Sequence, residues 1–263
     1  MSNGDRPVLV TGGTGTLGRV LVGTLLEAGH QVRVLSRRPR TASAHPGVDW
    51  FVGDLLTGAG IAAALTDVSA VIHCASNPRK PDEDVAAAGR LVAAAQDAGV
   101  PHLVYISIVG VDRVPLGYYR AKLRVEEILD AATVPVTILR TTQFHDFVAF
   151  LLRACSRGPV ALVPRGIRVQ PVDVREVAQR LAAIAAAPPA GRLEDVGGPQ
   201  VLTVDELMRI YLAGTGRRRP QWAVPFPGPV RAFRAGGQLT PDHATGRLTF
   251  AEWLQETESG RTA

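Results

Sequence analysis

Tyr118 and Lys122 lie four positions apart in the segment GYYRAK, residues 117–122. In a helix, residues at i and i+4 share one face, so these two side chains are expected to be neighbours. A tyrosine hydroxyl titrates near pH ~10, and a nearby ammonium favours the phenolate and lowers that pKa. Such a tyrosine can exchange a proton with a carbonyl or hydroxyl group during its reduction or oxidation. The pair therefore predicts acid–base chemistry, and the alternative is that it is only the polar start of a surface helix.

A glycine-rich turn near the N-terminus predicts a dinucleotide site. The segment VLVTGGTGTLGRV has glycines at 12, 15 and 18, between an apolar run and a segment with helical spacing. Glycine allows a tight turn and a close approach of the backbone to a pyrophosphate, and the helix N-terminus presents free N–H groups to the phosphates. The strand–turn–helix context makes this a strong signal, against the alternative of a turn without a ligand. The predicted cofactor contacts here are Gly12, Thr14, Gly15, Thr16, Leu17 and Gly18.

The end of the second apolar run indicates which dinucleotide is bound. An NAD-specific site usually has an acidic residue at this point, which accepts from the ribose 2′-hydroxyl. This sequence has Ser36, Arg37 and Arg38 instead. A guanidinium suits a 2′-phosphate, through paired charge-assisted hydrogen bonds. We therefore predict that NADP, as NADPH, is preferred over NAD; the alternative is that these arginines are only solvated surface charge.

Two later strand ends add predicted cofactor contacts. Asp54, in the segment GDL, could accept from the adenine amino group, and Leu55 could pack near the ring. Ala75 and Ser76 end the run AVIHCAS and could pass close to the cofactor. Ligands of open α/β sheets bind at these carboxyl ends of strands.

The segment RTTQF, residues 140–144, gives the last predicted cofactor contacts. Thr141 would face the ligand crevice, and Phe144 could stack on the nicotinamide or wall it off. His145 and Asp146 follow and resemble an acid–base pair. Because such a pair at a helix start more often caps the helix and lies on the surface, we expect that role for them.

The order of the segments predicts the fold. Short apolar runs alternate with segments of helical spacing as far as about residue 142. This alternation implies crossover connections and a parallel sheet covered by helices on both faces. We therefore predict an α/β fold, a doubly wound parallel sheet or Rossmann fold, with a small C-terminal substrate lobe. The predicted core is 1–143, completed by 167–186, and the predicted lobe is 144–166 and 187–263.

Composition limits the class of protein. Of the 263 residues, 46% are hydrophobic, which supplies a sizeable core. Two cysteines, with no Cys/His cluster, give no reason to predict a disulfide framework or a metal site. We see neither a signal peptide nor an apolar stretch long enough to span a bilayer, so we expect a soluble cytoplasmic protein. The oligomeric state stays open.

The net charge of +5 could indicate nucleic-acid binding. However, arginine is abundant along the whole chain, and the clusters RRPR and RRR are not interleaved with aromatic residues. We therefore predict a small-molecule substrate rather than nucleic acid.

The motifs TGGTGTLG, GDL, YISIVGVD, YYRAK, ILRTTQF and QPVDVREVA occur in this order. Together they resemble the atypical short-chain dehydrogenase/reductase superfamily, especially its NmrA-like, NAD(P)H-binding branch, over nearly the whole chain. The resemblance is specific for fold and cofactor and much less so for substrate. It implies that Tyr118 and Lys122 are catalytic and that Lys122 also bonds the nicotinamide ribose.

The sequence departs from the family pattern beside this pair. The family usually supplies a serine after the fifth strand to hold the substrate oxygen, and Ser107 is the nearest candidate. The segment SIVG is shorter than the usual serine-rich turn, and Ile108 stands where a second hydroxyl is common. Many NmrA-like proteins are NADP sensors, whereas others reduce quinones and similar acceptors. The resemblance thus implies an NADP(H)-dependent oxidoreductase acting on a carbonyl, quinone or activated double bond, or alternatively a non-catalytic NADP-binding regulator.

Overall fold

The computed structural model describes residues 6–40, 45–225 and 230–262. The chain divides into two compact units. The first consists of Met1–Ser107, Gly117–Arg140 and Val177–Glu194. The second consists of Ile108–Leu116, Thr141–Glu176 and Asp195–Ala263. Compared with the predicted boundaries, residues 108–116, 141–143 and 167–176 lie in the second unit, and 187–194 lie in the first.

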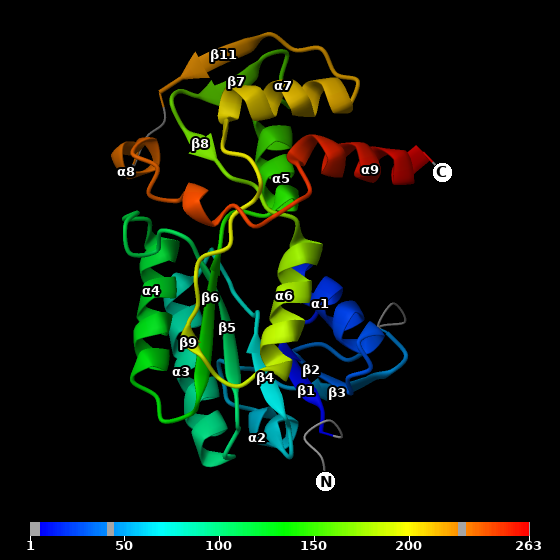
Figure 1. Ribbon diagram of the computed structural model, residues 1–263, viewed down its shortest axis with the longest axis vertical. Coiled ribbons are helices and arrows are strands. Elements are labelled where there is room, and N and C mark those ends of the chain that lie inside the picture. Colours follow the sequence, from blue (N-terminus) through cyan, green and yellow to red (C-terminus); the bar gives the residue numbers. More distant parts are fainter. Residues whose placement is uncertain (1–5, 41–44, 226–229, 263) are drawn as a thin grey trace. The chain divides into compact units, whose positions relative to one another are not determined.

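A seven-stranded parallel sheet forms the centre of the first unit (Figure 1). Its strands are β1 (Val8–Thr11), β2 (Val32–Ser36), β3 (Val48–Val52), β4 (Ala70–His73), β5 (Leu103–Ile108), β6 (Val136–Thr141) and β9 (Gly191–Arg192). They are arranged in the order β3-β2-β1-β4-β5-β6-β9. The chain therefore reverses its direction across the sheet between β1 and β4, which are neighbours. Such a switch point is where open parallel sheets bind ligands.

Helices cover both faces of this sheet, which confirms the predicted doubly wound α/β fold. They are α1 (Thr16–Glu27), α2 (Ile61–Leu65), α3 (Pro81–Asp97), α4 (Gly117–Asp130) and α6 (Val174–Ala186). Figure 1 shows α3 and α4 on one side of the sheet and α1 and α6 on the other.

A hydrophobic core fixes α3 and α4 to the sheet. Leu91 of α3, Leu129 of α4 and Leu103 of β5 are fully buried in one cluster. Burying each such side chain stabilises the fold by roughly 1.5–3 kcal/mol. The first turns of α3 and α4, which carry polar groups of the candidate site, are thus held on a rigid layer.

The second unit contains smaller sheets and shorter helices. Its elements are α5 (His145–Cys155), β7 (Ala161–Pro164), β8 (Arg168–Val169), β10 (Leu202–Thr203), α7 (Val204–Gly214), β11 (Gln221–Val224), α8 (Val230–Arg234), a 3-10 turn (Pro241–His243) and α9 (Phe250–Thr262). β7 pairs with β11 in parallel, and β8 pairs with β10 antiparallel. The segment 167–186, predicted to complete the core, therefore sends its strand β8 into the second unit. The edge strand of the large sheet is β9, which pairs with β6.

The start of α7 illustrates how sequence sets an element boundary in this unit. Thr203 accepts from the backbone N–H of Glu206, and the Glu206 carboxylate accepts from the backbone N–H of Thr203. This capping box satisfies two N–H groups that a helix start leaves free. Leu207 and Met208 then begin the buried face of the helix.

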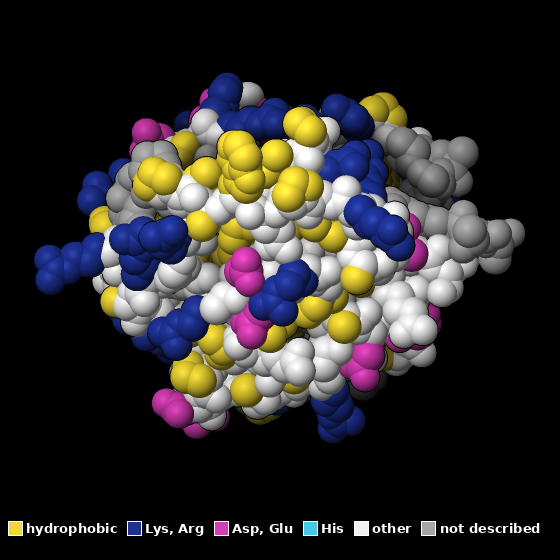
Figure 2. All heavy atoms as spheres, turned by 90° about the horizontal axis from the view of Figure 1, so that it is seen from above, with side chains coloured by type: hydrophobic (Ala, Val, Ile, Leu, Met, Phe, Trp, Pro, Cys, Tyr) yellow, Lys and Arg dark blue, Asp and Glu magenta, His cyan; other side chains and the backbone are white. Residues whose placement is uncertain are grey.

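The surface carries mixed side chains. On the face seen in Figure 2, basic side chains are spread among hydrophobic and acidic ones. Within the part of the chain that the structure describes, no helix combines the length and hydropathy needed to cross a membrane.

Candidate cofactor groove and active site

A groove of about 890 Å³ lies in the first unit, at the carboxyl ends of β1 to β4. Its volume falls in the usual range of small-molecule and cofactor sites, roughly 300–1,000 Å³. Most of the predicted cofactor contacts line it: Gly12, Thr14, Gly15, Ser36, Arg37, Arg38, Asp54, Leu55, Ala75 and Ser76. Four separate segments of the chain therefore converge where the sequence predicts a dinucleotide.

Two glycines of the first turn are required by close backbone contacts. Gly12 has φ +72°, and a Cβ added to it would lie 2.6 Å from the backbone nitrogen of Ala75. A Cβ on Gly18 would lie 2.1 Å from the carbonyl oxygen of Gly12. The space that a side chain would fill is therefore taken by backbone, and the N-terminus of α1 stays open toward the groove. This geometry fits a bound pyrophosphate.

The other predicted residues of this segment are in the first turn of α1. Leu17 is buried, whereas Thr16 is exposed. Their contacts with a cofactor stay predictions.

Basic side chains surround the groove beside β2. Arg37 and Arg38 are exposed along its wall, and Arg19 of α1 joins them. None of these guanidinium groups has an ion-pair partner among the described residues. The turn itself is held by Trp50, whose Nε1 donates to the carbonyl of Arg38 over 2.9 Å. Free cations on a fixed turn are the arrangement that a phosphate needs.

Asp54 and Leu55 follow β3 and line the groove. The Asp54 carboxylate accepts from the backbone N–H of Leu56 over 2.8 Å, which fixes its direction. One carboxylate oxygen is thus used locally, and the group keeps capacity for a further donor.

Ser76, after β4, links the groove to Tyr118. Its hydroxyl lies 2.6 Å from the Tyr118 hydroxyl and donates to Asp84 over 2.6 Å. Asp84 is in the first turn of α3 and also accepts from the backbone N–H of Asn77 over 2.6 Å. The structure therefore brings predicted cofactor residue Ser76 and predicted acid Tyr118 together.

Lys122 lies beneath this pair, on the buried stripe of α4. Its Nζ donates to the carbonyl of Ile106 over 3.2 Å and lies 4.7 Å from the centre of the Tyr105 ring. It is 5.9 Å from the centre of the Tyr118 ring, so the predicted i, i+4 neighbourhood exists. Burial lowers the pKa of Lys122 to about 8, and the negative charge of Asp84 opposes that effect.

The predicted effect of Lys122 on Tyr118 is wrong. Burial raises the pKa of Tyr118 to about 12; the hydrogen bond with Ser76 lowers it, and the charge of Asp84 raises it further. The Lys122 ammonium points at the Tyr105 ring and a carbonyl, and it does not contact the Tyr118 hydroxyl. Tyr118 is consequently a proton donor at neutral pH.

Ser107 lies in a separate buried network. Its hydroxyl donates to the carboxylate of Glu126, a fully buried residue of α4, over 2.5 Å. The same carboxylate accepts from Arg140 over 2.9 and 2.7 Å and pairs with Arg192 over 2.9 Å. The structure does not bring the Ser107 hydroxyl to that of Tyr118, and its catalytic role stays a prediction. Tyr119, the next residue of α4 after Tyr118, is buried.

Thr141 and Phe144 belong to the second unit. Thr141 forms a parallel bridge with Val196, and Phe144 forms one with Val172. Their predicted cofactor contacts stay predictions.

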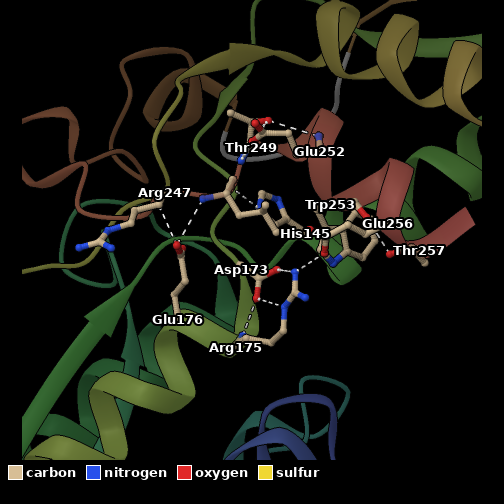
Figure 3. A network of polar contacts seen from close by, with 11 residues as sticks. His145, Asp173, Arg175, Glu176, Arg247, Thr249, Glu252, Trp253, Glu256 and Thr257 are labelled. Atoms are coloured by element: carbon tan, nitrogen blue, oxygen red, sulfur yellow. Dashed lines mark hydrogen bonds and ion pairs between the residues drawn. The ribbon is translucent and has the colours of Figure 1, made fainter. Parts of the chain in front are cut away.

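The expected surface role of His145 is wrong. The residue is fully buried at the start of α5, where its Nε2 lies 3.1 Å from the Leu248 carbonyl oxygen. Its ring is 5.7 Å from that of Phe250 and 5.6 Å from that of Trp253. Figure 3 shows it beside Asp173 and Arg175, which pairs with Glu256 of α9. The residue is buried because the closing helix α9 packs over it, a contact between segments far apart in sequence.

Sequence reasoning missed Asp84, Arg19 and Trp50. Asp84 lies in the acidic run PDED, which also reads as an ordinary helix start. Lysine usage is a separate signal, and it supports the role of Lys122. The chain has only two lysines, Lys80 and Lys122, among many arginines. Where a chain uses arginine almost everywhere, a lysine indicates a position that requires the properties of an ammonium group.

Comparison with known proteins agrees with this geometry. Residues 12–188 match a family described as NAD(P)H-binding. The (4-alkanoyl-5-oxo-2,5-dihydrofuran-3-yl)methyl phosphate reductase of Streptomyces griseus subsp. griseus is 33% identical, over 95% of this chain and 97% of its own. Two solved structures are similar in fold. The NADPH-dependent quinone oxidoreductase QOR2 of Escherichia coli with NADPH has TM-score 0.81 and 18% identity, over 95% of this chain and 99% of its own. The Citrobacter sp. triphenylmethane reductase with NADP(H) has TM-score 0.80 and 23% identity, with the same coverage.

The family match covers more than half of the chain, and the Streptomyces relative covers almost all of it. Two of the motifs that predicted the family, TGGTGTLG and GDL, supply residues of the groove. The chain therefore belongs to the NAD(P)H-binding family, in agreement with its resemblance to the NmrA-like branch of the atypical short-chain dehydrogenase/reductase superfamily.

Proposed function

We propose that the chain is an NADPH-dependent reductase that transfers hydride to a conjugated acceptor, such as a quinone, an activated double bond or a carbonyl, in a small organic molecule. The observation that carries this proposal is the Tyr118 hydroxyl, 2.6 Å from the groove residue Ser76. A proton donor thereby lies next to a residue of the groove where the predicted cofactor contacts converge.

The residues of the groove fit NADPH. The turn at Gly12–Gly18 and the start of α1 would hold the pyrophosphate, and Arg37 with Arg38 would hold the 2′-phosphate. When bound, the dinucleotide supplies the hydride. The absence of an acidic residue after β2 supports NADPH over NADH.

Tyr118 supplies the proton. Its raised pKa, about 12, keeps the phenol protonated at neutral pH, as a general acid requires. Lys122, with a pKa near 8, carries its positive charge at neutral pH.

The substrate class is supported by the names of the relatives. The substrate named for the Streptomyces reductase has a ring double bond conjugated with carbonyl groups. Quinones and triphenylmethane dyes are also conjugated, electron-poor acceptors. Hydride addition to a quinone or an activated double bond creates an anion whose charge is already delocalised, so one acid is sufficient. Addition to a triphenylmethane cation gives a neutral product and needs no proton. A cytoplasmic location stays a prediction.

NADPH oxidation in the presence of an acceptor panel tests the proposal. The panel consists of menadione, an acyl-substituted butenolide, a triphenylmethane dye and an unconjugated ketone. We expect turnover with the conjugated members. With menadione and the butenolide, which need a proton, kcat should fall at least ~100-fold in Tyr118→Phe, because general acids contribute that much. Tyr119→Phe, one position along α4, is the matched control and should retain activity. Equal turnover in Tyr118→Phe and wild type would refute the role of Tyr118.

The same assay separates the reductase from the alternative, a non-catalytic NADP-binding regulator. The burial of Ser107 against Glu126 favours that alternative, since it leaves Tyr118 without the usual serine. Tight NADPH binding with no turnover on any acceptor would support the regulator. Calorimetric titration with NADPH and NADH decides the cofactor preference in either case.

A further inference from the structure

Tyr118, Ser76 and Asp84 form a continuous chain of short hydrogen bonds. The Tyr118–Ser76 and Ser76–Asp84 oxygen distances are both 2.6 Å. An ionised carboxylate only accepts, so Ser76 gives its single proton to Asp84 and must accept from Tyr118. While Asp84 is ionised, the hydrogen bonds therefore run from Tyr118 through Ser76 to Asp84, and they reverse when Asp84 has taken a proton from solvent and becomes a donor.

The far end of this chain reaches water. Asp84 is half-buried and Ser76 is exposed, and both line the groove. The Asn77 N–H, 2.6 Å from the other Asp84 oxygen, fixes the carboxylate in this position. Ser107, by contrast, is 1% exposed and donates to Glu126. A proton taken from Tyr118 can therefore be replaced through Ser76, and no such route passes through Ser107.

We propose that Ser76 and Asp84 form the proton relay that reconnects the Tyr118 hydroxyl with solvent. This inference deepens the proposed reductase function and rests on it. Asp84 is then a positioning residue that acts through Ser76. Ser76 is the serine that contacts the Tyr118 hydroxyl, whereas Ser107, the predicted serine, donates to Glu126 instead.

Each step of the relay conserves protons. Tyr118 loses its O–H bond as its proton forms a new bond with the anion left by hydride addition. The Ser76 hydroxyl proton then moves to the Tyr118 phenolate, and Ser76 takes a proton from the Asp84 carboxyl group. Water or a buffer acid protonates Asp84 beforehand. One solvent proton therefore enters the product for each hydride.

The other groups around Tyr118 must be considered for any pH dependence. Tyr119 and Lys122 lie on its own helix, and Tyr105 faces it from β5. Asp84 also faces Tyr118, and its carboxylate is connected to the Tyr118 hydroxyl through the hydroxyl group of Ser76.

Steady-state kinetics of the full chain with NADPH and menadione test the relay. Asp84→Asn should lower kcat about 10- to 100-fold, because a supporting proton donor is lost. The menadione KM and the NADPH dissociation constant should stay within twofold, and kcat should now rise with the concentration of a small buffer acid. Ser76→Ala should show the same loss of kcat and the same dependence on buffer acid, and Ser76→Thr, which keeps the hydroxyl, should recover activity. A kcat of Asp84→Asn equal to that of wild type, and independent of buffer, would overturn the relay.

Asp82→Asn is the matched control. Asp82 is two positions earlier in the same helical turn, and its side chain is 90% exposed and paired with Arg124. The substitution removes the same charge without touching Ser76. A loss of kcat in Asp82→Asn as large as that in Asp84→Asn would show a general charge effect and would also overturn the relay.

A titration that needs no turnover separates this inference from the proposed function. Tyr118 is one of four tyrosines, so its ring signal can be assigned by NMR with labelled tyrosine and Tyr118→Phe. The pKa of Tyr118 should fall in Asp84→Asn, which removes a negative charge, and stay at the wild-type value in Asp82→Asn. An unchanged pKa in Asp84→Asn, or an equal fall in both variants, overturns the chain of contacts. A fall in Asp84→Asn alone supports it, even if wild type lacked turnover and the reductase proposal failed.

Discussion

Lys122→Met should stabilise the protein at neutral pH. The Lys122 side chain is buried, and its pKa is lowered from 10.5 to about 8 because burial disfavours the charged form. In the unfolded chain the ammonium is hydrated and titrates normally. Methionine has a similar length and no charge, so it occupies the same space without the cost of desolvation.

The sign and magnitude follow from proton linkage. Between pH 8 and 10.5 the native state binds fewer protons than the unfolded state, so the free energy of unfolding rises with pH. Each pKa unit corresponds to about 1.4 kcal/mol, which gives roughly 3 kcal/mol over this window. Below pH 8 the wild-type protein carries this cost in full, and above pH 10.5 the cost disappears. Lys122→Met should therefore be more stable than wild type by about 3 kcal/mol at pH 7, with an advantage that vanishes by pH 10.5.

Urea unfolding followed by tryptophan fluorescence, repeated at pH values from 7 to 10, measures this difference. Lys80→Met is the control, because Lys80 is the second lysine of the chain and its side chain is 63% exposed. It should show the pH dependence of wild type. With only two lysines, selective isotope labelling also gives the pKa of Lys122 directly by NMR. Parallel pH profiles for wild type and Lys122→Met, or a Lys122 pKa near 10.5, would refute the reasoning.

Four further outcomes follow from the structure. Arg37→Ala should weaken NADPH binding about 10-fold or more, since a charge-assisted contact is worth roughly 1.5–3 kcal/mol, and leave NADH binding unchanged in calorimetry; an unchanged NADPH:NADH ratio contradicts the 2′-phosphate assignment. Gly12→Ala should abolish dinucleotide binding while circular dichroism stays native-like, because an added Cβ meets backbone at 2.6 Å. Glu126→Gln should lower the free energy of unfolding by about 3–5 kcal/mol, because Arg140 keeps its charge without an anionic partner, and Glu126→Leu with Arg140→Met should recover most of it. Burial lowers the pKa of His73 to about 3, so stability present above pH 6.5 should be lost as pH falls toward 3, and an acid titration of His73→Gln should show a shallower loss.

The sequence alone determined the fold class, the cofactor turn and the basic strand end. These features are local. The glycine pattern predicts that the backbone is closely approached at Gly12 and Gly18. In the structure, a Cβ atom added to either residue would meet backbone atoms. Arg37 and Arg38 follow the second strand by chain connectivity, so their place at the groove needs no long-range contact. The alternation of apolar runs and helices fixes a parallel sheet for the same reason.

Only the tertiary structure decided which groups surround Tyr118. Ser76 and Asp84 reach it from segments that precede it by 42 and 34 positions, and neither spacing is visible as a motif. The hydrogen bond between Ser107 and Glu126 could not be predicted from the sequence either, because Glu126 is buried only once β5, α4 and β6 pack together. The direction of the Tyr118 pKa shift was predicted wrongly for the same physical reason. Hydrogen-bond partners and desolvation depend on which distant segments pack around a side chain, and the spacing of residues along one helix does not contain that information.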